Sequence, residues 1–439
     1  MRKACGITLK AAPLGKRGIE HSVPGLSWCK LRMKETNLTI TRRNLLQAAL
    51  SPLAALAAPV RDQVKITAIK AMQVKDPGTL IKIETDAGVA GYGPCGANGP
   101  FARNVIASLE GGRLPHLGLL GKDPLAIQVH FHNMFYAYPQ RGRQTRVLSG
   151  IDIALWDLAG KILGKPVSKL LGGNFRDEIL LYSHCTGGDY FSKEAWRDRA
   201  QELKSDPRGF QAFKVDIHHP LGVSMQQYIP SIGPQEARKV HQAYTLAREA
   251  FGPEIDIIVH CHAELDLPSA IKVAEAVEHI KPLFFEDPIS PAWSDSWLAL
   301  RRTTRIPIMT GEILELPENA SPFLQNQAVD CLQPDLINSG GITGTKMIAD
   351  QAALYRIPVC LHNVSGLALN MASQQFSAAI FNCPRMECTR NADRTKAAAG
   401  NALVIKNGRM KVSTLPGLGL DLDQDFLKAA RVDGEPWWG

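Results

Sequence analysis

The chain lacks the patterns that mark several common protein classes. Its nine cysteines are scattered over 439 residues without a CxxC pair or an even framework, so we expect buried thiols and no disulfide scaffold. Cys261 stands in no setting that marks a nucleophile. No GxGxxG follows the first strand-like segment and no P-loop lysine motif occurs, which argues against a doubly wound phosphate-binding sheet.

The excess of positive over negative charge is confined to one end of the chain. The formal net charge is +8, and residues 1–57 hold ten of the 50 Lys and Arg residues but two of the 42 Asp and Glu residues. The rest of the chain therefore carries 40 of each sign. A neutral body gives no reason to expect nucleic acid as a partner.

The basic N-terminal segment resembles a twin-arginine export signal. In TRRNLLQAALSPLAALAAP, Arg42 and Arg43 precede an apolar run, Leu45 to Ala58, that is too short to span a bilayer. Small residues end the run, so we expect cleavage near Ala58 and a periplasmic chain without a membrane anchor. Residues 1–58 are the predicted leader, with Met33 as an alternative start. If the leader is only an amphipathic or disordered tail, the protein stays cytoplasmic.

Residues 59–175 are expected to form an α+β capping domain. From Val64 the sequence alternates apolar and polar residues, as in a small antiparallel sheet, and a glycine-rich loop is predicted from Gly93 to Pro100. In RVLSGIDIALWDLAGKILG, apolar residues then recur at helical spacing up to Gly164, which provides a stop.

Residues 176–395 alternate short strand-like runs with helical stretches. The eight runs are ILLYSHC, AFKVDIHH, DIIVHCHAEL, PLFFEDP, IPIMTGEI, VDCLQPDL, IPVCLHN and FNCPRMEC. Such a βα repeat closes most naturally into a (β/α)₈ TIM-type barrel with its site at the C-terminal strand ends. The α/β fold predicted is therefore a barrel with an N-terminal cap. Residues 396–439, with a turn at Asn407–Gly408, are expected to return to the cap.

Ionisable residues end most of these runs. Glu286 and Glu312 are carboxylates that a buried site tolerates only with a cation, and a hard divalent metal suits both. Ion pairs with Lys214 are the plainer alternative. Asp335 and His362 follow on the next two strands, so the carboxylate can orient one imidazole nitrogen while the other moves a proton. A satisfied, partly buried histidine is the alternative there.

Strand alternation places two further pairs at the barrel mouth. Lys214 and Asp216 share one face of their strand, and His260 and His262 share one face of the next. Lys214 is expected to neutralise negative charge on a substrate, or simply to pair with Asp216 or Glu387. Asp216 is a candidate substrate-binding residue.

From about residue 64 onward the chain resembles the enolase superfamily, in particular the mandelate racemase and muconate lactonizing branch and its acid-sugar dehydratases. The segments that carry the resemblance are SGIDIALWDLAGKILGKPVSKLLGG, FKVD, FFEDP, TGE, QPDLINSGGIT and LHN. The resemblance implies Mg²⁺ held by acids ending the third, fourth and fifth strands. It also implies removal of a proton α to a carboxylate, giving an enediolate that the metal stabilises.

The resemblance also implies roles for individual residues. Glu286 and Glu312 match metal ligands, Asp335 and His362 the proton-abstracting dyad, and Glu387 the eighth-strand acid. His262 matches the histidine that protonates the leaving hydroxyl in galactonate- and mannonate-type dehydratases. The expected reaction is dehydration of a sugar acid to a 2-keto-3-deoxy acid, in a chain that forms homo-oligomers. Arg141 and Arg143 are candidates for holding the distal end of the substrate.

One position departs from the family pattern. His260 stands where the third-strand aspartate ligand belongs, and an imidazole suits Mn²⁺, Fe²⁺ or Zn²⁺ better than Mg²⁺. Asp256 is too far along the strand to substitute, whereas Glu264 and Asp266 are weaker alternatives. The departure also leaves open that the protein is a non-catalytic relative, which binds a sugar acid or another carboxylate without converting it. A purely structural or partner-binding protein is the least favoured reading, because it does not explain the other strand-end residues.

Overall fold

The computed structural model describes residues 64–75, 78–112, 115–137, 142–390 and 403–438. The predicted export signal and the leader cysteines lie outside these residues. Within them, no helix has the length and apolar character needed to cross a bilayer. All seven described cysteines are buried free thiols, as predicted.

The N-terminal part begins with the predicted antiparallel sheet, in the order β1-β2-β3. The strands are β1 (Ile66–Gln73), β2 (Thr79–Thr85) and β3 (Ala90–Cys95). The predicted loop from Gly93 to Pro100 is therefore wrong in its first part, because Gly93 to Cys95 belong to β3 and α2 begins at Gly99. A Cβ on Gly93 would lie 2.1 Å from the Gly150 carbonyl oxygen, so this glycine serves close packing of strand on helix.

Helical segments follow the strands in the N-terminal part. They are α2 (Gly99–Gly111), a 3₁₀ turn (Pro115–Leu117), α3 (Ile127–His132), a π turn (Asn133–Ala137), α4 (Arg143–Leu163) and α5 (Val167–Leu170). Two of them, α2 and α4, pack on this sheet. The predicted long helix is α4, and Gly164 ends it in the left-handed conformation at φ 63°.

The sheet of the second part closes into the predicted barrel. Its parallel strands run in the order β4 to β9, and β10 pairs with β4. Single bridges, Leu332 with Val359 and Leu361 with Met386, place the seventh strand between β9 and β10. The strands are β4 (Glu178–His184), β5 (Ala212–Asp216), β6 (Asp256–His260), β7 (Phe284–Glu286), β8 (Ile308–Thr310), β9 (Cys331–Leu332) and β10 (Met386–Glu387).

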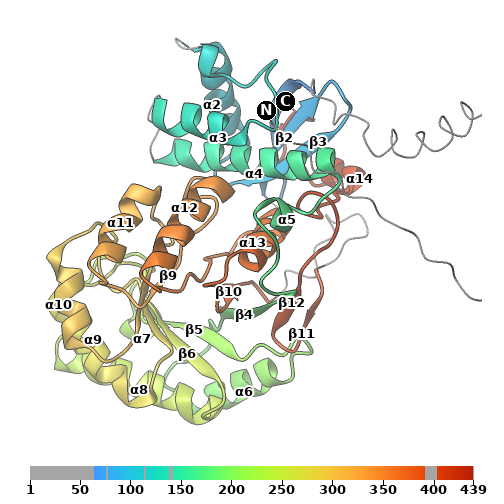
Figure 1. Cartoon of the computed structure of the whole chain (residues 1–439). Coiled ribbons are helices and arrows are strands. Elements are labelled where there is room, and N and C mark those ends of the chain that lie inside the picture. The colour runs from blue at the N-terminus through green and yellow to red at the C-terminus, as the bar shows by residue number, and fades with distance from the viewer. Residues whose placement is uncertain (1–63, 76–77, 113–114, 138–141, 391–402, 439) are drawn as a thin grey trace, which may run out of the picture. The chain divides into compact units, whose positions relative to one another are not determined.

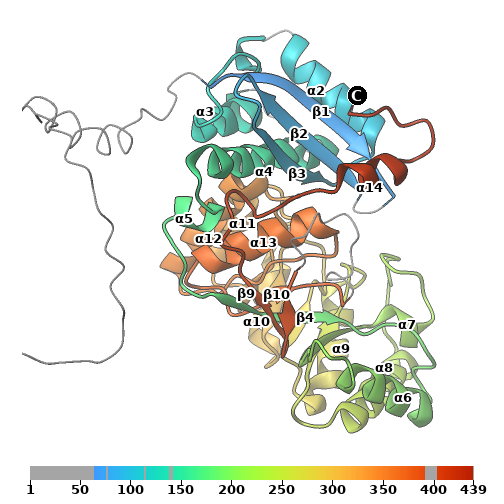
Figure 2. The same ribbon diagram turned by 90° about the vertical axis from the view of Figure 1, so that its right-hand side faces the viewer.

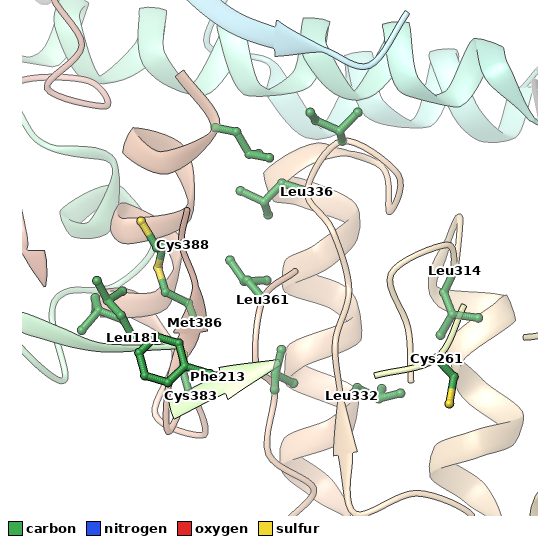
Figure 3. Close-up of a cluster of buried hydrophobic side chains, with 14 of the residues drawn as sticks. Leu181, Phe213, Cys261, Leu314, Leu332, Leu336, Leu361, Cys383, Met386 and Cys388 are labelled. Atoms are coloured by element: carbon green, nitrogen blue, oxygen red, sulfur yellow. The ribbon is translucent and has the colours of Figure 1, made fainter. Parts of the chain in front are cut away.

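Helices surround the barrel (Figure 1). They are α6 (Lys193–Lys204), α7 (His218–Leu221), α8 (Pro234–Phe251), α9 (Leu267–Val277) with a 3₁₀ turn (Glu278–Ile280), α10 (Asp295–Thr303), α11 (Pro317–Gln325), α12 (Gly341–Leu354) and α13 (Leu367–Ala379). Outward side chains of the strands pack against them, as Figure 3 shows for Leu181, Phe213, Leu332 and Leu361.

Inward side chains fill the barrel and lead up to its mouth. Tyr182, Ala212, Ile258, Met309, Cys331 and Cys360 form one buried cluster drawn from six strands. Strand alternation then places the residues two positions later, such as His184, Lys214 and His260, on the same inner face one layer higher. The packed interior thus supports a layer of polar side chains at the C-terminal strand ends.

The C-terminal segment does two things. First it forms the hairpin β11 (Ile405–Lys406) and β12 (Arg409–Lys411), turning at Asn407–Gly408 as predicted, and β12 pairs with β4 of the barrel. It then passes through α14 (Gln424–Ala429) to the N-terminal sheet (Figure 2). Arg431 forms a bridge there with Val74, the residue after β1. The exact domain boundaries stay predictions.

The capping part is tied to the barrel through α4. Asp152 Oδ2 accepts a hydrogen bond of 3.0 Å from the Thr343 amide in the first turn of α12. The Trp156 indole donates to the Thr343 hydroxyl over 2.9 Å. A carboxylate at a helix N-terminus satisfies an otherwise unpaired amide and complements the helix dipole. Burial raises the pKa of Asp152 to about 7, although its hydrogen bonds to Thr343 oppose this shift.

Candidate active site

Lys214 lies at the centre of the polar layer. It is fully buried, and its Nζ is 2.5 Å from Glu286 Oε1 and 3.0 Å from Glu387 Oε2. Burial alone would lower the pKa of Lys214, but Glu286, Glu387 and Glu312 raise it above its ordinary value. The ammonium group therefore stays charged and neutralises carboxylates at the floor of the site.

The pKa values of the two carboxylates beside this lysine are shifted in opposite directions. Burial raises the pKa of Glu286 to about 7 in spite of Lys214. For Glu387, the charges of Lys214 and His362 overcome the effect of burial and hold the pKa well below its usual range. Glu286 Oε2 is buried and makes no hydrogen bond. This oxygen can accept a cation without breaking an existing bond.

His260 completes a possible ligand set with Glu286 and Glu312. One ligand atom from each of the three residues falls within 4.8 Å of the other two. Burial, reinforced by the charge of Lys214, holds the pKa of His260 well below its ordinary value. His260 is therefore a neutral imidazole, the form that coordinates metals, and neither ring nitrogen makes a complete hydrogen bond. These residues fit a divalent cation.

The other acids near His260 in the sequence are engaged elsewhere. Asp256 lies at the opposite end of β6 and pairs with Arg385 over 3.1 Å. Asp266 caps α9 by accepting a hydrogen bond from the Ser269 amide over 2.8 Å. Glu264 contacts His262, with Oε1 3.3 Å from Nδ1.

The predicted dyad is assembled at the same mouth. His362 Nδ1 and Asp335 Oδ2 form a hydrogen bond of 2.7 Å. His362 Nε2 points toward the ligand set, at 3.3 Å from Glu312 Oε2 and 3.8 Å from Glu387 Oε2. Burial alone would lower the pKa of His362, but Glu387 and the bond to Asp335 raise it to about 10. A carboxylate thus orients one nitrogen and leaves the other facing the site.

His262 lies beside His260. The two ring centroids are 4.1 Å apart, and the His262 ring is half-buried. Burial would lower its pKa, but the hydrogen bond and charge of Glu264 raise it. His262 is therefore more readily protonated than an ordinary histidine, which suits a proton donor.

The barrel closure also brings in residues that the sequence did not single out. His184 Nε2 lies 2.6 Å from Glu387 Oε1, and the His184 ring is 5.4 Å from that of His260 between centroids. His184 ends the first barrel strand, and this position, shared with the other marked residues, was the signal available in the sequence. Glu264, which the sequence suggested only as a weaker alternative metal ligand, was not predicted in its role as the carboxylate partner of His262.

The substrate-binding candidates fall in different places. Asp216 is buried in the polar layer with Oδ1 2.7 Å from His260 Nδ1. Arg143 is exposed at the start of α4 and lines a cleft of about 390 Å³ together with Arg146, Ile313, Glu315 and Asn338. The Asn338 amide donates to the Glu312 carbonyl oxygen over 2.7 Å, so the cleft adjoins the ligand set. Arg141 lies outside the described residues.

Comparison with known proteins adds two family matches. Residues 54–172 match the mandelate racemase/muconate lactonizing enzyme N-terminal domain, and residues 195–426 match the enolase C-terminal domain-like family. The chain is 31% identical over 383 residues to a D-xylonate dehydratase of Haloferax volcanii, covering 86% of this chain and 91% of that protein. It is 28% identical to a D-mannonate dehydratase of a Sphingomonas species, covering 79% of this chain and 89% of the relative.

Solved structures agree with these matches. A mandelate racemase/muconate lactonizing enzyme-like protein from Rubrobacter xylanophilus superposes with a TM-score of 0.76 at 28% identity, covering 86% of this chain and all of that chain. A member of the enolase superfamily from Salmonella Typhimurium gives a TM-score of 0.75 at 28% identity, covering 85% and 98% of the two chains.

Proposed function

The chain belongs to the mandelate racemase/muconate lactonizing enzyme family of the enolase superfamily, and from this premise we propose that it dehydrates a sugar acid. The observation that carries the proposal is the convergence of the His362–Asp335 dyad and His262 on a three-donor cation site. The relatives named for D-xylonate and D-mannonate dehydration support this reaction class. The product would be a 2-keto-3-deoxy acid. Self-association of the chain stays a prediction from the resemblance.

A divalent cation would be held by His260, Glu286 and Glu312. When bound, it supplies positive charge that stabilises negative charge developing on the substrate carboxylate. The same charge counteracts the acids that raise the pKa of His362. The family resemblance implies Mg²⁺, and the imidazole ligand makes Mn²⁺, Fe²⁺ or Zn²⁺ the alternatives.

The chain's own residues would divide the proton transfers. His362 Nε2, oriented through its bond to Asp335, removes the proton α to the carboxylate. His262, whose pKa is raised by the hydrogen bond and charge of Glu264, gives a proton to the departing β-hydroxyl, which leaves as water. The resulting enol tautomerises to the ketone. Lys214 and Glu387 lie beneath the mouth, where Lys214 contacts the acids Glu286 and Glu387. The neutralisation of substrate charge by Lys214 stays a prediction.

The distal part of the substrate would occupy the cleft beside Glu312. Arg143 and Arg146 supply positive charge there, and Glu315 accepts a hydrogen bond of 2.8 Å from the Gly142 amide at the start of α4. The non-catalytic alternative is not favoured. Although His260 replaces the aspartate, His260, Glu286 and Glu312 still supply three donors for a cation.

The first test combines metal analysis with a turnover screen. D-Xylonate, D-gluconate, D-galactonate and D-mannonate are offered with Mg²⁺, Mn²⁺, Fe²⁺ or Zn²⁺, and release of a 2-keto-3-deoxy acid is measured. We expect dehydration of a sugar acid that stops when metal is chelated. A folded protein that binds metal and sugar acid but converts none of these acids would contradict the proposal.

Exchange in D₂O separates the two histidines. His362→Asn is expected to abolish both dehydration and α-hydrogen exchange. His262→Gln is expected to slow dehydration by about 10²- to 10⁴-fold while α-exchange continues, since only departure of the hydroxyl loses its proton donor. Loss of exchange in both variants, with metal still bound, would refute this division of roles.

A further inference from the structure

Asp216 and His260 face each other across two neighbouring strands. They are directly paired in the parallel register of β5 and β6. Asp216 Oδ1 lies 2.7 Å from His260 Nδ1, and their side chains are 3% and 2% exposed. The other ring nitrogen, Nε2, lies 3.4 Å from Glu286 Oε1. The imidazole thus stands between a carboxylate outside the ligand set and one inside it.

Asp216 has few other groups to compensate its charge. Over the described part of the chain, the basic side chains within ion-pair distance of Asp216 are His260 and, at 4.0 Å, His218. Lys214 is on the same strand, but its ammonium group contacts Glu286 and Glu387. A buried carboxylate is costly unless it is paired, so the close approach to His260 has a physical reason.

Metal-bound histidines usually donate their second ring nitrogen to a carboxylate or carbonyl. This outer contact fixes the tautomer, orients the ring and makes the coordinating nitrogen a better donor. His260 Nδ1 lies 2.7 Å from Asp216 Oδ1 without the alignment of a hydrogen bond. A proton on Nδ1 that turns toward Asp216 when a cation binds would leave the lone pair on Nε2 for that cation. Asp216 also returns the negative charge that is lost when a histidine replaces an aspartate ligand.

We infer that Asp216 is a positioning residue that makes His260 competent as the third metal ligand. The inference rests on the proposed metal role of His260. It reassigns Asp216 from a substrate contact to a support of the ligand set, and it pairs the unusual histidine on β6 with an aspartate on β5. The site then holds a cation through two carboxylate ligands and one imidazole ligand. The Asp216 carboxylate orients that imidazole without itself being a ligand.

Two further sets of donors compete for Asp216. Asp216, His218 and His262 bring ligand atoms within 4.8 Å of one another, and so do His184, Asp216 and His260, so Asp216 would be a direct ligand if a cation bound at either set. The number of ions bound per chain tests the first of these sets, and a double-mutant cycle tests both. Our inference requires one ion whose affinity depends on Asp216.

The test is Mn²⁺ binding to metal-stripped full-length protein, measured by equilibrium dialysis. Asp216→Asn is expected to weaken binding by about 10- to 100-fold, the usual effect of losing an outer-shell partner. Asp256→Asn, which removes a carboxylate from the far end of β6, is the matched control and should bind as the wild type does. Wild-type protein that binds no metal would defeat the proposed metal centre itself. Normal binding by Asp216→Asn would defeat only this inference.

A double-mutant cycle separates positioning from general damage. His260→Asp replaces the imidazole by the family's carboxylate, which has no second nitrogen to orient and repels Asp216. In this background Asp216→Asn should leave Mn²⁺ affinity unchanged or increase it. An equal loss in both backgrounds, or two ions per chain falling to one, would overturn the inference. If Asp216→Asn does not fold, Asp216→Ser in both backgrounds gives the same comparison.

Discussion

Lys214 is the only Lys or Arg side chain among the described residues that contacts both Glu286 and Glu387. It is fully buried, as are both carboxylates. Such a cluster is held together by mutual compensation, because each charge has been removed from water and depends on its partners. A change at one residue therefore acts on stability as well as on chemistry.

Replacing this lysine should destabilise the fold strongly. Lys214→Met leaves two buried carboxylates without their cation, and we expect the free energy of unfolding to fall by about 3–5 kcal/mol in metal-free protein. Lys346→Met is the control, because Lys346 forms an i,i+4 surface pair with Asp350 that contributes about 0.3–0.5 kcal/mol. Urea unfolding measures both, and similar losses in the two variants would contradict the burial argument.

The residue types at the mouth were predictable, whereas their pairings were not. Strand-end positions identified Glu286, Glu312, Asp335 and His362 from sequence alone. The contact between His184 and Glu387 depends on barrel closure, which joins strands about 200 residues apart. Likewise, the role of Asp216 depends on strand register, and a one-residue shift would turn it away from His260.

At the scale of elements, the spacing of apolar residues and the residues that end helices and strands predicted most of the structure. Seven of the eight strand runs and α4 lie where apolar spacing placed them, the remaining run, IPVCLHN, is present as single bridges, and Gly164 ends the helix as expected. The error lay in β3, where glycines resemble a loop in sequence. Gly91 and Gly93 are there because α4 packs directly on the strand backbone, and a single sequence does not reveal such a contact.

This packing gives an element-scale prediction. Gly93→Ala places a Cβ 2.1 Å from the Gly150 carbonyl oxygen, so β3 and α4 must separate, and we expect a loss of about 1–3 kcal/mol in stability. Gly111→Ala is the control, since nothing lies within 4 Å of its Cβ position and alanine favours the helix. Thermal unfolding should show a lowered midpoint only for the first variant. Unchanged stability of Gly93→Ala would show that the interface adapts.

At the scale of the whole molecule, the leader stays a prediction. We expect Arg42→Lys combined with Arg43→Lys to retain the chain in the cytoplasm of a bacterium that has twin-arginine export, because that route reads the arginine pair. Lys34→Arg, outside the pair, should not change export. Cell fractionation and N-terminal sequencing would check this, with cleavage expected near Ala58. Export of the double variant at the normal level would disprove the signal.

The two ends of the described chain meet in the cap, and this sets the order in which the molecule can be completed during synthesis. The buried Glu435 carboxylate accepts a hydrogen bond of 2.9 Å from the Gln73 amide and pairs with Arg103. The first sheet is thus made early but receives this partner only 362 residues later in the chain. A nascent chain on the ribosome must therefore carry an unfinished cap until the segment around Glu435 has emerged to close it.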